Sequence, residues 1–588
     1  MASQQKLLRM EPILYAIVGL LLILTGVSHS QPKWLGFVYD PRLSEKVSES
    51  LSHVLTAYGL LFLGLALLSY ALSLRGTSLL LTAANRSHQA AVELGRALSS
   101  SLRDHPPRGQ EIAWLMAAFA VGLGIRGYFL AWPMRYDESE TFLKFVNRGF
   151  LDLFYYPRPN NHVLHTLLVK LSTLLWGAHP VSIRFPALLS GMASLLLTFC
   201  LCRKLREERS GLLAITAMAV IPCMVFFSAN ARGYSLLVFL TLTLALMAAH
   251  VAEKPSLPGC GAASFIAALG MMTVPSMLFA VAGIYLWVAC LFICKRRTLV
   301  TTLRQFVIPC TLMTLAFTLL LYTPSIVASG GLRPIVANRH LRSLHWQAFL
   351  HRIYPHLREV FSFLSSDLPP LVVVIGLVLL LVGVLGAIRG RNGGLAWLLP
   401  SMFLGAVIVF LLKHSIPPAR IWIYLMPFLL VLADSGFTYL SKGLSRSLPF
   451  LPPLLLAILG MVCAASLMSK EATANCEAPL VAKYLKPLVN ESDLIRLRRS
   501  SVSYPVRFYL WYYGVPHQKE EATPGVGKEF FVVKKSRYTI GDLTEKPVIE
   551  LLDWGDIAIY QALPGEGSRA GQERGRPKEE GGGNLILR

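Results

Sequence analysis

Three carboxylates lie within four positions of the segment RYDESETF, residues 135–142, in a chain of which only 15% of the residues are charged. Asp137, Glu138 and Glu140 directly follow an apolar run that ends at Met134. A carboxylate can accept the proton of a hydroxyl group while that hydroxyl attacks an electrophilic carbon. Acidic residues also favour the first turn of a helix. The segment therefore predicts either a catalytic base or a helix cap formed by Asp137 and Glu138.

Apolar runs that could position these carboxylates recur along the chain. Of its 588 residues 54% are hydrophobic, and the mean hydropathy is +0.53. Runs of about 20 apolar residues are long enough to cross the hydrocarbon core of a membrane. We predict about thirteen spans, at residues 12–28, 54–75, 112–134, 181–202, 211–228, 233–252, 261–275, 276–294, 305–328, 369–388, 394–412, 420–440 and 449–469. The net charge of +23 would indicate nucleic-acid binding in a soluble protein, but here the basic residues lie between the apolar runs, as membrane-flanking residues do.

One apolar stretch, residues 161–177, is predicted to lie flat in the membrane interface. Its leucines share one helical face, whereas His162, His165 and Lys170 lie mostly on the opposite face. With this stretch flat and the N-terminus cytoplasmic, four basic clusters fall inside, at 75–111, 203–209, 294–297 and 389–391. If the stretch crossed, the last three clusters would move outside. The carboxylates are therefore predicted to face the lumen, the periplasm or the exterior, and Glu140 is predicted to be solvated.

Basic residues are also abundant in loops that this topology places outside. They are Arg158, Arg232, Lys413, His414, Arg420 and, in the loop 330–368, Arg333, Arg339, Arg342, Arg352 and Arg358. This excess opposes the usual distribution of positive charge in membrane proteins. Contact with lipid headgroups is one explanation. The other is an anionic ligand whose phosphate oxygens are bound by guanidinium groups.

RYDESETF and the following segment YYPRPNNHVLHTLLVKLSTLLWGAHPVSIRFPALLSGMASLLLTFCLCRKL (155–205) resemble the GT-C glycosyltransferases. The similarity is to family 39, which includes protein O-mannosyltransferases and the aminoarabinose transferase of lipid A. In that family an acidic pair opens the first external loop, and a tyrosine–basic–proline step leads into a juxtamembrane helix and the next span. The corresponding features are Asp137–Glu138, Tyr156–Pro157–Arg158–Pro159, the helix 161–177 and VSIRFPALLSG at 181–191. SANARGYSL (228–236) and PPARIWIYLMPFLLVLA (417–433) resemble later segments, and the similarity extends to about residue 440.

The resemblance implies a polytopic α-helical membrane protein with a GT-C fold, about 13 transmembrane helices and juxtamembrane helices in the first external loop. It implies inverting transfer of a hexose or pentose from a polyprenyl-phosphate donor to an acceptor hydroxyl on the extracytoplasmic face. Asp137 is the implied general base and Glu138 its companion. Arg158 occupies the implied donor-phosphate position, with Arg232 and Arg420 as supporting ligands. Further contacts to donor or acceptor are expected from Tyr156, Asn161, His162, His165 and Tyr234.

No cofactor is predicted. Some family members carry a further acidic residue in the second external loop. Here 228–235 offers no acidic residue, only Asn230, Arg232 and Tyr234. No bridging metal is therefore predicted, and metal dependence stays open. The nine cysteines form no CxxC pair or His/Cys cluster at metal-ligand spacing. The partners expected are the lipid-linked donor, a glycan, lipid or protein hydroxyl as acceptor, and membrane lipids, with no nucleic acid.

The chain is predicted to divide into four regions. Residues 1–111 hold extra N-terminal transmembrane helices and a cytoplasmic loop, and 112–469 form the GT-C catalytic domain, with the catalytic loop at 134–180. Strand-like runs FFVV, VIELL and IAIY predict a small extracytoplasmic α/β domain within 470–562, and 563–588 is predicted to be a disordered tail. Residues 1–30 could alternatively be a cleaved signal peptide.

The predicted location is the bacterial inner (plasma) membrane, with the site facing the periplasm or exterior, although a eukaryotic host stays open. The sugar, the acceptor and the oligomeric state are not indicated by the sequence. Two other function classes remain: a lipid or solute transporter, and a non-catalytic scaffold that binds a lipid-linked sugar. Transporter sites usually lie near the middle of the spans, whereas the charges here gather at one membrane face.

Overall fold

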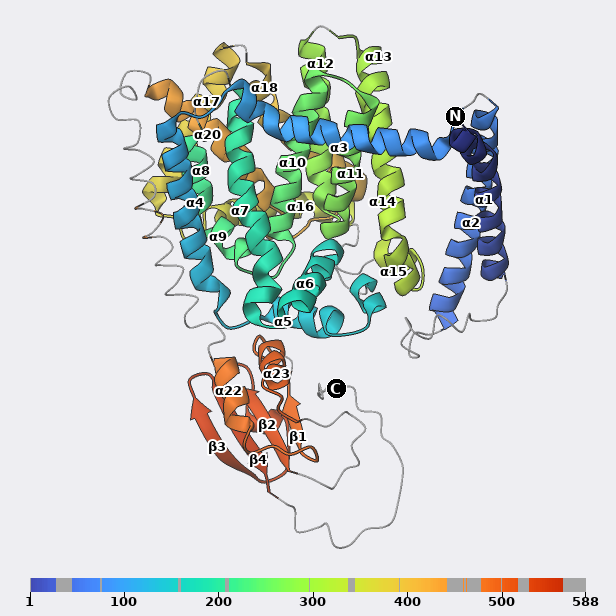
Figure 1. Ribbon diagram of the computed structural model, residues 1–588. Coiled ribbons are helices and arrows are strands. Elements are labelled where there is room, and N and C mark those ends of the chain that lie inside the picture. Colours follow the sequence, from blue (N-terminus) through green and yellow to red (C-terminus); the bar gives the residue numbers. More distant parts are fainter. Residues whose placement is uncertain are drawn as a thin grey trace.

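The computed structural model describes residues 2–27, 45–74, 77–156, 160–206, 211–295, 297–336, 344–390, 392–441, 458, 460, 462, 477–498, 500–516 and 528–563. Within these residues, nine helices are long and apolar enough to cross a membrane. The predicted class, a polytopic helical membrane protein with a small C-terminal sheet domain, is confirmed (Figure 1). The predicted count of about thirteen spans is not confirmed, and the run 449–469 lies almost entirely outside the described residues.

The helices of the first half are α1 (Ala2–Val27), α2 (Glu45–Ser73), α3 (Leu79–Asp104), α4 (Gly109–Leu130), α5 (Tyr136–Thr141), η2 (Phe142–Val146), η3 (Phe150–Phe154), α6 (Val163–Trp176), α7 (Pro180–Leu205), α8 (Leu212–Val220), α9 (Pro222–Ser228), α10 (Tyr234–Glu253), α11 (Leu257–Thr273) and α12 (Met277–Cys294). The later ones are α13 (Leu299–Thr302), η4 (Leu303–Val307), α14 (Ile308–Ala328), α15 (Arg333–Val336), α16 (Trp346–Leu364), α17 (Pro370–Arg389), α18 (Gly393–Ala396), α19 (Leu398–Lys413), η6 (Ala419–Leu425), α20 (Met426–Leu440), α22 (Glu477–Leu485), α23 (Ser503–Tyr512) and η7 (Ile540–Asp542).

Helices α7 and α10 form the centre of the bundle. Almost every residue of α10 is buried, and α7, α11 and α12 pack around it. In contrast, α17 and α14 bury few residues and expose leucines along most of their length. Outer apolar faces of this kind are suited to contact with lipid. The protein is an integral membrane protein whose polar site must lie where the bundle meets water.

Glycines allow α17 and α20 to cross at very short range. A Cβ atom on Gly383 would lie 2.0 Å from the carbonyl oxygen of Leu432, and one on Gly436 would lie 1.8 Å from that of Leu379. Both distances are far below van der Waals contact, so only glycine fits at the crossing. Small residues let transmembrane helix backbones approach closely, which strengthens their packing in lipid.

The predicted span at 211–228 is broken into α8 and α9 at Pro222, which has no N–H to donate. The carbonyls at the end of α8 are bound instead by Arg126 of α4, whose guanidinium lies 2.6 Å from the oxygen of Ala219 and 3.0 Å from that of Met218. At the start of α8, the carboxylate of Asp434 accepts the backbone N–H of Leu213. Charged side chains inside the bundle thus provide hydrogen-bond partners for the unpaired backbone groups at the ends of α8.

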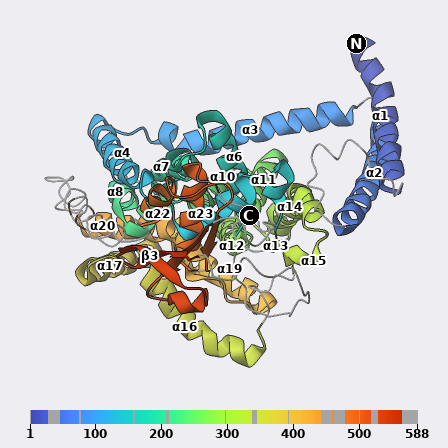
Figure 2. The same cartoon turned by 90° about the horizontal axis from the view of Figure 1, so that it is seen from below.

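The region 77–104, treated in the sequence only as part of a loop, contains the 26-residue helix α3. Ser78 caps it by accepting the N–H of Leu81, and its inner face buries Ala97 and Ser101. Figure 1 shows α3 running across one end of the bundle and leading to α1 and α2, which stand together at one side. Figure 2 shows the same arrangement from below.

The C-terminal domain contains a four-stranded sheet in the order β1-β2-β4-β3, with β1 (Leu494–Leu497) parallel to β2 (Glu529–Lys534) and antiparallel pairs elsewhere. The runs predicted as strands form β2, β3 (Val548–Trp554) and β4 (Ile557–Ala562). Helix α23 packs on α5 (Figure 1). The Tyr509 hydroxyl accepts the N–H of Met134 at 3.0 Å, so this domain covers the segment that carries the three carboxylates.

Candidate active site

The carboxylates lie on α5, a helix of six residues that leads into the π-helical turn η2. The Glu138 side chain accepts the backbone N–H of Arg135 at 2.8 Å, which caps the start of α5. The chain then reaches α6, whose 14 residues extend about 21 Å. This is shorter than the hydrocarbon core, in agreement with the prediction that residues 161–177 do not cross.

The carboxylate of Glu138 accepts hydrogen bonds from protein groups at all of its acceptor positions. Both of its oxygens bind the guanidinium of Arg184 on α7, with Nε at 3.1 Å from Oε2, and the backbone N–H of Ala231 donates to Oε2 at 2.9 Å. With the bond from Arg135 this makes four hydrogen bonds, about the number that a carboxylate can accept. Burial raises the pKa of Glu138, but the charge and hydrogen bonds of Arg184 outweigh it, so the pKa lies below its ordinary value.

Arg184 extends this connection to the end of α4. Its guanidinium also donates to the carbonyls of Phe129, Leu130, Trp132 and Pro133. One buried ion pair therefore holds α4, α5, α7 and the loop before α10 in fixed relation. The sequence contained one signal for it, an arginine four residues inside an apolar run, because a charge at such a depth needs a partner.

Asp137 has a different environment although it is the adjacent residue. Its side chain is 39% exposed, and its Oδ2 lies 3.6 Å from Arg232 and 3.8 Å from Arg420. Arg232 precedes α10 and Arg420 begins η6, so three segments far apart in sequence meet here. The structure thus brings together three of the predicted site residues.

Arg232 is almost completely buried and keeps unused hydrogen-bond donors. Its NH1 group binds the side chain of Asn160, but its Nε and NH2 have no hydrogen-bond acceptor within the described part of the chain. A buried charged donor without an acceptor is costly. An anionic ligand beside Asp137 could supply the acceptors.

Glu140 is buried, so the prediction that it is solvated is wrong. It binds Lys144 at 2.6 Å and accepts the side-chain N–H of Asn160 at 2.9 Å, while Asn160 in turn accepts from Arg232. The helical wheel placed Glu140 on a polar face, but its partner Asn160 lies on another part of the loop. Glu140, Asn160 and Arg232 form a chain of contacts that ends at Asp137, and sequence reasoning missed it.

Tyr234 lies between the two arginines and α6. The guanidinium carbons of Arg232 and Arg420 each lie 5.8 Å from its ring centre, within the range of cation–π attraction. The ring of His162 packs edge-on against Tyr234 at 5.0 Å. Tyr234 and His162 therefore adjoin the charged cluster, and their contact with donor or acceptor stays a prediction.

Both histidines of α6 are buried and neutral. Burial, with the charge of Arg232, holds the pKa of His162 well below its ordinary value and lowers the pKa of His165 to about 3. The Nδ1 atom of His162 accepts the N–H of Gly233 at 2.7 Å, which leaves the proton on Nε2. Neither ring nitrogen of His165 has a hydrogen-bond partner among the described residues.

The remaining predicted residues differ in their placement. Asn161 is buried and uses its amide to bind the carbonyls of Leu153 and Tyr155 and the hydroxyl of Thr166, so it braces the loop. Tyr156 is buried in an apolar cluster beside α14. Arg158, the predicted donor-phosphate ligand, lies outside the described residues. In the described part of the chain no group of three His, Cys, Asp or Glu side chains is placed to hold a metal ion.

Comparison with known proteins agrees with this fold. Residues 160–325 match the family described as dolichyl-phosphate-mannose-protein mannosyltransferase. ArnT from Cupriavidus metallidurans bound to undecaprenyl phosphate is 12% identical, with a TM-score of 0.50 over 78% of this chain and 99% of that chain. Its apo state is 12% identical, with a TM-score of 0.51 over 77% and 99%. This chain has a GT-C fold. The resemblance inferred from RYDESETF and the segment after it is confirmed at the level of the fold.

The other comparisons add less. The archaeal oligosaccharyltransferase AglB from Archaeoglobus fulgidus, in complex with an inhibitory peptide and a dolichol-phosphate, is 10% identical over 70% of this chain and 61% of that chain, with a TM-score of 0.39. No curated protein sequence matches. The family match begins after Asp137 and ends before Arg420, so it includes only part of the candidate site.

Proposed function

We propose that this GT-C protein is a membrane glycosyltransferase that transfers a monosaccharide from a polyprenyl-phosphate donor to an acceptor hydroxyl. The observation that carries the proposal is the position of Asp137, half exposed and beside two arginines from separate loops. A base and a phosphate-binding group are the two functions that such a transfer needs at one place. The ArnT structure bound to undecaprenyl phosphate supports a polyprenyl-phosphate donor for this fold.

In the proposed reaction, Asp137 accepts the proton of the acceptor hydroxyl, and the hydroxyl oxygen forms a bond to the anomeric carbon of the sugar. The bond between that carbon and the phosphate oxygen breaks, and its electron pair leaves with the polyprenyl phosphate. Attack from the side opposite the leaving group inverts the anomeric configuration. Negative charge accumulates on the departing phosphate, where Arg232 and Arg420 stabilise it. Arg158 stays a predicted third phosphate ligand.

Glu138 is a positioning residue in this proposal. Its four hydrogen bonds leave no acceptor position for a substrate proton, and they fix the helix that presents Asp137. Tyr234 and the Nε2–H of His162 adjoin the arginines and are proposed to contact the sugar phosphate. We further propose that the site faces the periplasm or exterior of a bacterial inner membrane, as the distribution of basic loops indicates.

The test is a transfer assay with the full-length protein in proteoliposomes. A panel of radiolabelled polyprenyl-phosphate sugars is supplied with membrane extract as the acceptor source, and the labelled product is identified by mass spectrometry. Asp137→Asn is expected to lower transfer by about 10²- to 10⁴-fold, the usual contribution of a general base. Asp152→Asn, a half-buried carboxylate of the same loop, is the matched control and is expected to keep wild-type transfer.

Three results would overturn the proposal. Wild-type transfer by folded Asp137→Asn protein would show that another group is the base. Movement of the labelled lipid across the bilayer without a covalent product would show a transporter, and donor binding without turnover over the whole acceptor panel would show a scaffold.

A further inference from the structure

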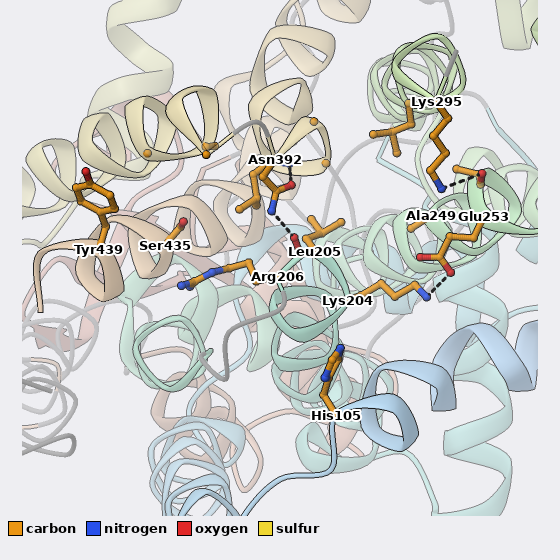
Figure 3. A pocket seen from close by; sticks show the side chains of 18 residues that line it. His105, Lys204, Leu205, Arg206, Ala249, Glu253, Lys295, Asn392, Ser435 and Tyr439 are labelled. Atoms are coloured by element: carbon orange, nitrogen blue, oxygen red, sulfur yellow. Dashed lines mark hydrogen bonds and ion pairs between the residues drawn. The ribbon is translucent and has the colours of Figure 1, made fainter. Parts of the chain in front are cut away.

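A cavity of about 640 Å³ lies at the end of the bundle opposite Asp137. Figure 3 shows the residues that line it. Helix α7 connects the two places, because Arg184 lies at the carboxylate end and Lys204 lines the cavity. These residues are about 20 positions apart, which corresponds to about 30 Å of helix. That length equals the thickness of the hydrocarbon core. The cavity and the candidate active site therefore lie at opposite faces of the membrane.

Three cationic side chains line this cavity, each at or just beyond the end of a helix. Lys204 and Arg206 come from the end of α7, and Lys295 follows α12. Among the described residues of the lining, Glu253 at the end of α10 is the one carboxylate. Figure 3 shows the Lys204 and Lys295 side chains near Glu253, whereas the Arg206 side chain points away from them. Positive charge thus exceeds negative charge around the cavity.

The three cations are unequally compensated. Lys204 lies 2.6 Å from Glu253, and Arg206 lies 2.9 Å from Asp434. Lys295 is exposed, and its ammonium group contacts the carbonyl oxygen of Ala252 at 3.4 Å, the outer limit of a hydrogen bond. Helix C-termini carry partial negative charge, which stabilises a nearby cation without any ligand. That effect accounts for basic residues at helix ends, but it does not account for an open space of this size between them.

The rest of the lining combines apolar residues and glycines with the polar side chains of His105, Asn392, Ser435 and Tyr439. Hydrocarbon surface is provided by Leu205, Ala249, Leu291 and Leu395. Backbone atoms line the cavity at the glycines Gly386, Gly390, Gly393 and Gly394. Cationic side chains beside hydrocarbon surface fit a molecule that combines a phosphate group with a hydrocarbon part. Lysine and arginine bind phosphate oxygens through charge-assisted hydrogen bonds.

We propose that this cavity binds the phosphate group of a phosphate ester at the membrane face opposite Asp137. Lys204, Arg206 and Lys295 bind the phosphate oxygens, and Glu253 competes with the ligand for Lys204. The ligand is an anionic membrane lipid or a soluble phosphate ester, which share this chemistry. The site is independent of the proposed glycosyltransfer, because none of its residues adjoins the carboxylate end.

The test measures binding to purified full-length protein in neutral detergent. The probes are short-chain phosphatidylglycerol, phosphatidylcholine with the same chains, and glycerol 1-phosphate, and bound molecules are counted by native mass spectrometry. Since a basic residue near an anionic lipid surface contributes about 1 kcal/mol, Lys295→Ala is expected to weaken phosphatidylglycerol binding about fivefold, and Lys204→Ala with Lys295→Ala about thirtyfold. Lys254→Ala, on the same face but outside the lining, is the matched control and is expected to change nothing.

The Glu253→Gln substitution is expected to change phosphatidylglycerol binding in the opposite direction. It frees Lys204 from its carboxylate, so phosphatidylglycerol binding is expected to strengthen several-fold, which a misfolded protein could not show. Binding of phosphatidylglycerol but not glycerol 1-phosphate assigns a lipid, whereas equal binding of both assigns a soluble ester. Equal binding of phosphatidylcholine, equal losses in Lys254→Ala and Lys295→Ala, or no binding of either phosphate probe would overturn the proposal.

Discussion

Substitution of Glu138 by glutamine tests whether this residue positions the site or reacts with substrate. The change removes the charge that faces Arg184, and both side chains are buried, with exposures of 0% and 1%. Removing one partner of a buried ion pair costs about 3–5 kcal/mol, because the other charge is left without compensation. Arg184 keeps four backbone carbonyls as acceptors. We therefore expect a loss near the lower end, about 3 kcal/mol.

The assay is thermal unfolding of the detergent-solubilised protein, followed by size-exclusion chromatography after heating. Because the entropy of unfolding scales with chain length, a loss of this size in a chain of 588 residues corresponds to a fall in Tm of about 2–3 °C. Glu138→Gln combined with Arg184→Met removes both charges and is expected to recover part of the loss. Glu359→Gln is the control, because that carboxylate is 65% exposed and its contact with His356 is worth little.

The pH dependence follows from the lowered pKa of Glu138. A carboxyl whose pKa is lower in the folded state stabilises the protein above the unfolded pKa of about 4.3. That stability is lost as pH falls through the folded value. The difference in Tm between wild type and Glu138→Gln should therefore be constant from about pH 8 to pH 5 and shrink only below about pH 4. Wild-type Tm together with abolished sugar transfer in Glu138→Gln would refute the positioning role and indicate direct contact with substrate.

Three other substitutions test separate parts of the structure. Asn160→Ala removes the acceptor of Arg232, a hydrogen bond to a charged group, so kcat/KM for the lipid donor should fall about 10- to 100-fold, mainly through KM. Gly233→Ala places a Cβ 2.8 Å from Nδ1 of His162, so it should displace that ring and lower transfer more than stability. Gly383→Ala should cost about 1–3 kcal/mol or more, because its Cβ overlaps the carbonyl of Leu432.

Gly383→Ala has a matched control on the same helix. Gly376→Ala lies on the same helix as Gly383 with nothing within 4 Å of the added Cβ, so it should leave Tm unchanged or raise it. An equal fall in Tm in Gly376→Ala and Gly383→Ala would contradict the close crossing of α17 and α20. For Asn160→Ala, a fall in kcat at unchanged KM would contradict a role in donor binding. For Gly233→Ala, unchanged transfer would show that the position of His162 does not matter.

Hydrophobic runs were sufficient to predict the class of fold. The backbone N–H and C=O groups of each span must be hydrogen-bonded within lipid, and a helix is the simplest structure that achieves this. One predicted span, 211–228, differs in the structure for a physical reason. Pro222 breaks one run into two short helices whose ends are satisfied by Arg126 and Asp434 from other helices. A hydropathy pattern does not show such compensation, since it depends on partners about 90 or more than 200 residues away.

The members of the candidate site were predictable as residue types, but their environments were not. Asp137, Arg232 and Arg420 stood out because charges are rare in this chain and these lie at the predicted outer face. The partnership of Glu140 with Asn160 was not visible, because a loop whose course is set by tertiary packing brings them together. Helix α3 was missed because its sequence has too little hydrocarbon for a span, although its amphipathic pattern was present.

The contrast between Asp137 and Glu138 follows from helix geometry. Successive residues on a helix point about 100° apart. When Glu138 turns inward to meet Arg184, its neighbour must turn aside, toward the exposed edge where Arg232 and Arg420 end. The inward carboxylate gains four donors and loses its capacity to accept another proton, whereas the outward one keeps open positions. Adjacent acids of nearly identical chemistry are thereby separated into a structural and a reactive candidate, because environment and not residue type decides which carboxylate can serve as a base.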